Sequence, residues 1–179
     1  DAVEADVSEA NITVHIGFLM MPEYTLSTFS NAVSVLRMAN RLSGRELYKY
    51  SVFSLDGESV TSSAGLTLEL EGSLASAGEM NVLIVCGGYN VKNYCGKEVI
   101  DALRAMAKKN IPLGAMCTGS YVLAAAGLLD GYRSTIHWEN IASMREQFPK
   151  PNISSSLFVI ERHRLSCCLF NTSVPAARR

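Results

Sequence analysis

The sequence predicts an α/β protein in which a mostly parallel sheet carries helices on both faces. Apolar runs of strand length alternate along the chain with segments whose apolar residues recur at helical spacing. Such alternation indicates βαβ units, whose right-handed crossovers place helices on both sides of the sheet. Hydrophobic residues make up 48% of the 179 residues and charged residues 18%, so the chain is not disordered and can bury a core without disulfides or metal.

The first half of the chain opens on a strand and a helix. Residues 12–20 are almost all apolar, as expected of a central strand that is buried on both faces. Residues 26–40 carry an apolar side chain every three or four positions, which predicts a helix that stops near Gly44. We then expect a strand at 50–55 and a short antiparallel strand or hairpin within 60–71.

The second half repeats this alternation with shorter elements. The predicted strands are 80–86, 111–116 and 134–136, the predicted helices are 97–109, 118–128 and 138–148, and two short β segments are predicted at 156–160 and 164–167. The expected layout is one domain over residues 11–168, with a disordered or tag-like arm at 1–10 and an irregular tail at 169–179. The tail has no helical period, so we expect no helix-turn-helix motif within this chain.

Composition and charge exclude several classes of protein. Lys and Arg number 16 and Asp and Glu number 17, whereas a domain that binds DNA by itself normally carries a basic surplus. The five cysteines are odd in number and form no C-x-x-C pair, which is typical of reduced cytoplasmic thiols and not of disulfides or a zinc site. Residues 111–129 lack charge, but glycines and a proline interrupt them, so we expect a strand, a turn and a helix rather than a membrane span. Neither a signal peptide nor a cofactor is expected.

Four predicted strand ends should meet at one edge of the sheet, where open α/β sheets bind their ligands. These ends fall at residues 21–24, 86–89, 115–119 and 135–138. They are rich in glycine, in aromatic residues and in side chains that titrate. The sequence therefore predicts a ligand site at this edge.

Cys117 stands where a predicted strand runs straight into a predicted helix. This arrangement resembles the nucleophile elbow of hydrolases, with cysteine in place of serine. A thiol at a helix N-terminus has a lowered pKa, and the backbone N–H groups there can hold an anion or an oxyanion. The alternative is that Cys117 is a small buried hydrophobe, as most free cysteines are.

His137 follows at the end of a short predicted strand and could converge with Cys117. A Cys–His pair would supply a nucleophile and its base, but His137 could equally be satisfied by the backbone or form a pocket wall. Glu139 could favour a helix dipole, orient His137 or meet a cationic ligand. Of the other histidines, His15 is expected in the core and His163 on a solvated hairpin tip.

Six short motifs occur in a characteristic order along the chain. They are Gly17-Phe18-Leu19-Met20-Met21-Pro22, Leu36-Arg37-Met38-Ala39-Asn40, Cys86-Gly87-Gly88, Gly114-Ala115-Met116-Cys117-Thr118-Gly119, Ala126-Gly127-Leu128-Leu129-Asp130-Gly131 and Thr135-Ile136-His137-Trp138-Glu139. Together they resemble the N-terminal sensor domain of GlxA-type AraC/XylS transcriptional regulators, of the ThiJ/PfpI, class I glutamine amidotransferase-like superfamily. The resemblance covers about residues 11–167.

This resemblance implies a flavodoxin-like three-layer sandwich that senses a small metabolite of the amino-acid or quaternary-amine type. It also implies a cytoplasmic homodimer whose DNA is bound only by a separate C-terminal helix-turn-helix domain, outside this chain, with no membrane partner and no bound metal. The ligand-binding residues expected at the strand ends are Glu23, Tyr24, Gly87, Gly88, Tyr89, Cys117, Thr118, Gly119, His137, Trp138 and Glu139.

Each group of these residues has an expected role. Amides near Thr118 would take a carboxylate, and Tyr24, Tyr89 and Trp138 would wall the site, where a ring attracts a cationic head by cation–π interaction. Either Glu23 or Glu139 would add the opposing charge.

Two departures from the superfamily bear on catalysis. Many of its enzymes place a carboxylate from the first strand–helix region beside the cysteine, whereas residues 25–29 contain no acid. Its PfpI-type proteases carry histidine directly after the cysteine, whereas Thr118 follows Cys117 here. No catalytic residue is expected in a sensor. The alternatives are a hydrolase or amidase with Cys117 as nucleophile and His137 as base, and a redox sensor that uses Cys117.

Overall fold

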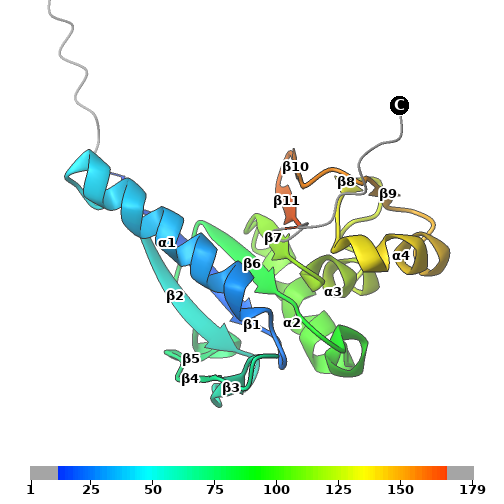
Figure 1. Cartoon of the computed structure of the whole chain (residues 1–179), viewed down its shortest axis with the longest axis horizontal. Helices are drawn as coiled ribbons and strands as arrows, with labels where there is room; N and C mark the ends of the chain where they lie inside the picture. The colour runs from blue at the N-terminus through cyan, green and yellow to red at the C-terminus, as the bar shows by residue number, and fades with distance from the viewer. Residues whose placement is uncertain (1–11, 169–179) are drawn as a thin grey trace, which may run out of the picture.

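A seven-stranded sheet forms the centre of the computed structural model, which describes residues 12–168 (Figure 1). Its order is β10-β11-β7-β6-β1-β2-β5, and every neighbouring pair is parallel except β10 against β11. The strands are β1 (Val14–Met20), β2 (Tyr48–Ser54), β5 (Gly72–Ser73), β6 (Val82–Cys86), β7 (Leu113–Met116), β10 (Phe158–Glu161) and β11 (Arg164–Cys167). The predicted α/β class with a mostly parallel sheet is confirmed. The arm and tail expected at 1–10 and 169–179 fall outside the described residues.

Helices cover both faces of this sheet. The helices are α1 (Leu26–Ser43), α2 (Lys97–Lys108), α3 (Gly119–Ala125) and α4 (Ile141–Gln147), with short 3₁₀ turns η1 (Leu74–Ser76), η2 (Val91–Tyr94) and η3 (Trp138–Asn140). Two small two-stranded sheets pair β3 (Val60–Thr61) with β4 (Thr67–Leu68), and β8 (Arg133–Ser134) with β9 (Asn152–Ile153). Helix α1 packs on one face of the main sheet, while α2 and α3 pack on the other.

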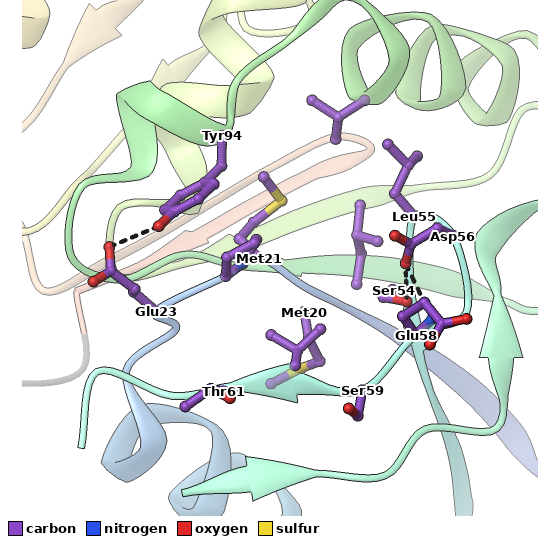
Figure 2. A pocket seen from close by; sticks show the side chains of 14 residues that line it. Met20, Met21, Glu23, Ser54, Leu55, Asp56, Glu58, Ser59, Thr61 and Tyr94 are labelled. Carbon is purple, nitrogen blue, oxygen red and sulfur yellow. Dashed lines mark hydrogen bonds between the residues drawn. The ribbon is translucent and has the colours of Figure 1, made fainter. Parts of the chain in front are cut away.

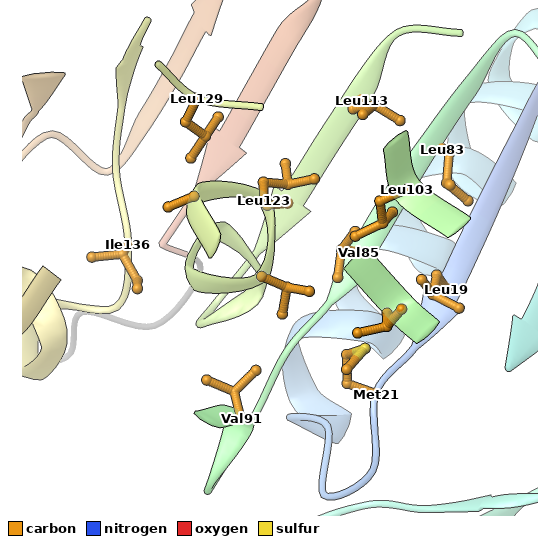
Figure 3. Packing of buried hydrophobic residues seen from close by; sticks show 14 of the residues in the cluster. Leu19, Met21, Leu83, Val85, Val91, Leu103, Leu113, Leu123, Leu129 and Ile136 are labelled. Carbon is orange, nitrogen blue, oxygen red and sulfur yellow. The ribbon is translucent and has the colours of Figure 1, made fainter. Parts of the chain in front are cut away.

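The alternation of side chains along β1 explains why both faces need a cover. Ile16, Phe18 and Met20 point into the layer under α1. Leu19 points the other way, into the larger core under α2 and α3 that Figure 3 shows. Successive side chains of a strand point to opposite faces, so an all-apolar strand is stable only when both faces are buried. The near-continuous apolar run of this segment is thus the signature of a central strand.

The bounds of the elements confirm one predicted helix end and correct two other predictions. Helix α1 ends as expected, with Gly44 in the left-handed conformation at φ 68°. The strand predicted at 134–136 should end at the same edge as the main strands, but Ser134 pairs with Ile153 in a separate small sheet. The predicted helix at 118–128 is shorter, because α3 ends at Ala125 and Gly127 takes a left-handed turn.

The uncharged stretch at 111–129 folds as strand β7, a sharp turn and the buried helix α3. Among the described residues, no helix has both the length and the apolar character needed to span a membrane.

Asn40 ties α1 to the strand that follows it. Its side-chain amide donates to the carbonyl oxygen of Tyr48 at 2.6 Å, and its side-chain oxygen accepts from the backbone N–H groups of Leu47 and Tyr48 at 2.9 Å each. Three hydrogen bonds from one side chain fix the entry of β2 alongside β1, and the same asparagine closes the second of the six sequence motifs.

We expect Asn40→Ala to lower the free energy of unfolding by about 2–3 kcal/mol, because the backbone groups of Leu47 and Tyr48 lose their partners. Urea denaturation followed by circular dichroism measures the change. Asn31→Ala is the matched control, since Asn31 is exposed on the same helix and alanine has the higher helix propensity. Equal stability of the two variants would contradict this role.

Candidate functional site

Three loops meet at the carboxyl ends of β1, β6 and β7, and they meet backbone to backbone. Tyr24 forms an isolated antiparallel bridge with Gly88, and the N–H of Tyr89 donates to the carbonyl oxygen of Glu23 at 3.0 Å. The buried hydroxyl of Thr118 donates to the carbonyl oxygen of Gly88 at 2.7 Å. These bonds fix the position of the loop after β6 against both of its neighbours.

Glycine is required at this meeting point for steric reasons. A Cβ atom on Gly88 would overlap the carbonyl oxygen of Glu23, one on Gly87 would overlap the backbone N of Gly119, and one on Gly119 would overlap the carbonyl oxygen of Val85. Because the obstacles are backbone atoms, no side-chain rotation can relieve them. Gly87 and Gly119 thus serve close packing of the loops.

Cys117 sits on the sharp turn between β7 and α3. Its backbone adopts the left-handed conformation with φ 56°, and its side chain is 6% exposed. A non-glycine residue in this region is strained and is held there by its surroundings, as is common at functional sites. The predicted elbow geometry is present.

The surroundings of Cys117 favour its neutral thiol. Burial raises its pKa above the ordinary value, and the hydrogen bonds from Thr25 and from the backbone N–H of Thr118 lower that pKa only in part. The hydroxyl oxygen of Thr25 lies 3.3 Å from the sulfur. The predicted lowering of the pKa by a helix N-terminus is therefore wrong, because desolvation of the thiolate outweighs the donors around it.

His137 and Cys117 are joined through the backbone, not through their side chains. The N–H of His137 donates to the carbonyl oxygen of Cys117 at 3.2 Å. The imidazole Nδ1 lies 3.8 Å from a carboxylate oxygen of Glu139 and the ring is tilted against Trp138. Within residues 12–168, no hydrogen bond links the imidazole to the thiol. The arrangement brings the two residues together without forming a nucleophile–base pair.

An open cleft of about 700 Å³ lies above these strand ends. We call it the elbow cleft. Its lining residues are Glu23, Thr25, Ser63, Gly88, Tyr89, Asn90, Val91, Lys92, Asn93, Cys117, Thr118, His137, Glu139 and Asn140. Most of them are polar, and both signs of charge are present.

Seven of the eleven residues expected from the sequence line the elbow cleft, and four do not. The four are Tyr24, Gly87, Gly119 and Trp138. Tyr24 is 1% exposed and packs edge-on against Phe29, so it belongs to the core under α1 and cannot wall the cleft as expected. Trp138 is 41% exposed beside His137 but is not among the lining side chains.

Sequence reasoning missed six polar lining residues. Asn90, Lys92 and Asn93 come from the loop and turn after β6, and a polar loop following Gly87-Gly88 was a usable signal. Nothing in the sequence pointed to Thr25, Asn140 or Ser63. Ser63 reaches the cleft because its N–H donates to the carbonyl oxygen of Tyr24 at 3.0 Å.

Glu23 is the most firmly held carboxylate of the cleft. Its backbone is left-handed with φ 58°. One carboxylate oxygen accepts hydrogen bonds from Asn90 and from the hydroxyl of Tyr94 at 3.1 Å each, and Figure 2 shows the bond from Tyr94. Asn90 is itself left-handed with φ 52°. Three lining residues, Glu23, Asn90 and Cys117, are therefore held in strained backbone conformations around one cleft.

Charge and hydrogen-bonding groups, rather than metal ligands, characterise the site. In the described part of the chain, no three His, Cys, Asp or Glu side chains lie close enough to hold a metal ion. Lys92 donates to the hydroxyl of Ser143 at 3.0 Å and lies 5.4 Å from the ring centre of Tyr121. A lysine has three N–H donors, so Lys92 keeps donors beyond the one used by Ser143.

Comparison with known proteins identifies one family and several regulators. The DJ-1/PfpI family matches residues 15–154. The chain is 45% identical to the HTH-type transcriptional regulator GbdR of Pseudomonas aeruginosa over 151 residues. This match covers 84% of this chain and 41% of that protein. It is 34% identical to the HTH-type transcriptional regulator GlxA of Rhizobium meliloti, covering 89% of this chain and 50% of that protein. The chain thus spans half or less of the length of these relatives.

A solved structure and an enzyme also match. The crystal structure of an AraC family transcriptional regulator from Pseudomonas putida superposes with a TM-score of 0.77 at 33% identity, covering 86% of this chain and 83% of that one. An isonitrile hydratase from Pseudomonas putida is 32% identical over 128 residues, which cover 71% of this chain and 54% of the enzyme.

We expect Gly119→Ala to lower the free energy of unfolding by about 3 kcal/mol or more, since the added methyl group overlaps backbone that cannot move aside. Gly78→Ala is the control, because a Cβ at Gly78 meets no atom within 4 Å. Thermal and urea denaturation compare the two. A Gly119→Ala variant as stable as the control would show that the loops are not locked together.

We expect the rate of Cys117 alkylation by iodoacetamide to rise with a midpoint above the ordinary thiol pKa of about 8.5, because burial disfavours the thiolate. Thr25→Val should move the midpoint further up by removing a donor to the thiolate, while Thr25→Ser keeps the hydroxyl and should not. Peptide mapping by mass spectrometry separates Cys117 from the other four cysteines. A midpoint below the ordinary value would indicate an activated nucleophile.

Proposed function

Because the chain belongs to the DJ-1/PfpI family, we propose that it is the effector-sensing domain of an AraC-type transcriptional regulator. The elbow cleft would bind a small polar metabolite beside Cys117 and His137. The similarity to regulators covers most of this chain, and the Pseudomonas putida structure extends it to the fold. A cytoplasmic location follows from a role in transcription.

The mixed charge of the cleft lining is the observation that carries the choice of ligand. Glu23 and Glu139 supply negative charge, while Lys92 and the amides of Asn90, Asn93 and Asn140 supply donors. A zwitterion with a cationic head and a carboxylate satisfies both sets, since each charged group of the ligand finds its opposite in the lining. Amino acids and trimethylammonium carboxylates have this chemistry.

The exposed ring of Tyr89 also favours a ligand that has a cationic head. Tyr89 lines the cleft and its side chain is 70% exposed, so the ring is free to fold over a bound ligand. A cation over the face of a tyrosine gains about 0.5–1 kcal/mol at an exposed site. Trp138 does not line the cleft, but its ring contacts that of His137, which does.

Binding in the cleft would act on transcription through the rest of the regulator. The matched regulators are named helix-turn-helix proteins and are about twice as long as this chain or longer. We place DNA binding in a separate domain of the regulator. We propose that the sensing domain described by residues 12–168 forms a homodimer, because paired half-sites on DNA call for a two-fold symmetric protein. A ligand that prefers one arrangement of the dimer shifts the population toward it.

The second candidate function is a cysteine-dependent hydrolase or hydratase. The elbow at Cys117 and the match to an isonitrile hydratase favour it. The raised thiol pKa, the hydroxyl of Thr25 beside the sulfur and the lack of a thiol–imidazole hydrogen bond among the described residues argue against it. We therefore prefer binding to catalysis, and we rank a redox role for the same protonated thiol below both.

Calorimetry with a panel of amino acids and trimethylammonium carboxylates tests the sensing role. We expect one class to bind, and we expect Tyr89→Ala to weaken that class by about threefold through loss of the cation–π contact. Glu139→Gln should weaken it as well, whereas Glu146→Gln, on the exposed face of α4, is the charge-matched control. Failure of the folded wild-type protein to bind any member of the panel would refute the proposal.

A further inference from the structure

A second cavity, of about 450 Å³, shares Glu23 with the elbow cleft but is otherwise lined by different residues (Figure 2). It lies between the carboxyl ends of β1 and β2, the loop at 55–59, strand β3 and the side chains of Tyr94 and Val99. Neither Cys117 nor His137 contributes to it. We call it the acidic cavity.

The acidic cavity is apolar in the middle and negatively charged at its two ends. Figure 2 shows Glu23 with Tyr94 at one end and Asp56 with Glu58 at the other, with Met21 lying between them. Leu19, Leu55, Val60 and Val99 add to the apolar lining. Its fourteen lining residues include three carboxylates and no Lys, Arg or His.

One carboxylate at each end is held by hydrogen bonds, and the exposed Glu58 adds a third beside Asp56. Asp56 accepts hydrogen bonds from the hydroxyl of Ser54 and the N–H of Glu58 at 3.0 Å each, which lowers its pKa and keeps it ionised at neutral pH. Glu23 accepts from Asn90 and Tyr94 through one carboxylate oxygen, which leaves the other oxygen for a ligand. Within residues 12–168, none of the three carboxylates forms an ion pair.

We propose that the acidic cavity binds an α,ω-alkyl diamine, with one ammonium group at Glu23, the other at Asp56 and Glu58, and the methylene chain over the apolar middle. A metal ion does not fit this arrangement, since the three carboxylates are not clustered closely enough to hold one. A monoamine would leave one acidic end without a partner. In a diamine a hydrocarbon chain separates two cationic groups. In the cavity apolar side chains likewise separate two acidic ends, so the two match.

The diamine proposal does not rest on the sensing role proposed for the elbow cleft. Asp56 and Glu58 do not line the cleft, and Tyr89 and Glu139 do not line the acidic cavity. Substitutions can therefore remove either site without touching the other. Glu23 alone belongs to both.

Calorimetry of the whole chain at low ionic strength, with diamines from 1,3-diaminopropane to 1,6-diaminohexane, tests the proposal. We expect the affinity to pass through a maximum at one chain length, and n-butylamine to bind at least about tenfold more weakly than the best diamine, because it makes only one charge-assisted contact. Equal affinity of the monoamine, no dependence on length, or no binding of any diamine would overturn the proposal.

Paired variants separate specific recognition from general charge attraction. The double substitution Asp56→Asn and Glu58→Gln should weaken diamine binding at least about tenfold, and asparagine keeps the side-chain oxygen that accepts from Ser54 and Glu58. Glu46→Gln with Glu146→Gln changes net charge equally at remote exposed positions and should leave the affinity unchanged. An equal loss in both double variants would overturn the proposal.

Tyr89→Ala distinguishes this site from the elbow cleft. We expect it to leave diamine binding unchanged, because Tyr89 does not line the acidic cavity and alanine keeps the backbone N–H that donates to Glu23. A loss of diamine binding in this variant would assign the diamine to the cleft and overturn the proposal. Failure of the zwitterion panel would leave the diamine result unaffected.

Discussion

The contact of three loop backbones at the glycines after β6 is the constraint on which the rest of the site depends. Gly87 and Gly88 bring the loop after β6 against the elbow and the loop after β1, and Gly119 brings the elbow against β6. No other residue type permits this spacing, because each Cβ would overlap main-chain atoms. Once the loops are locked, Glu23 and Cys117 have little conformational choice, and both are held in the left-handed region. The strain at these residues is offset by the surrounding packing and hydrogen bonds.

The same constraint determines what the elbow can do. It buries the thiol of Cys117 against the hydroxyl of Thr25, so the neutral form of the thiol is favoured. The imidazole of His137 lies beside Glu139 and forms no hydrogen bond with the thiol within residues 12–168. A nucleophile needs a stabilised thiolate and an aligned base, and this arrangement provides neither. It does place fixed polar groups under an open cleft, where such groups can orient a small ligand. A domain of the DJ-1/PfpI family can in this way keep the elbow geometry around a buried thiol.

The sequence was sufficient for the fold class, for the family and for the position of the cleft. Apolar runs and glycine turns located β1, β6 and β7, and the carboxyl ends of parallel strands necessarily converge. It was insufficient wherever long-range packing decides. Tyr24 was expected at the ligand, but the backbone bridge to Gly88 turns its ring into the core. The proximity of Thr25 to Cys117 and the return of Ser63 toward Tyr24 depend on contacts between distant segments, which no local pattern encodes.

The claim that the elbow cleft is a sensor site is tested most directly by following backbone amide resonances during titration with an amino acid or a trimethylammonium carboxylate. If the cleft binds the ligand, the largest shifts should come from Tyr89, Asn90, His137 and Glu139, which line it from two separate segments of the chain. Saturable shifts confined to another part of the domain, with these four amides unmoved, would contradict the account.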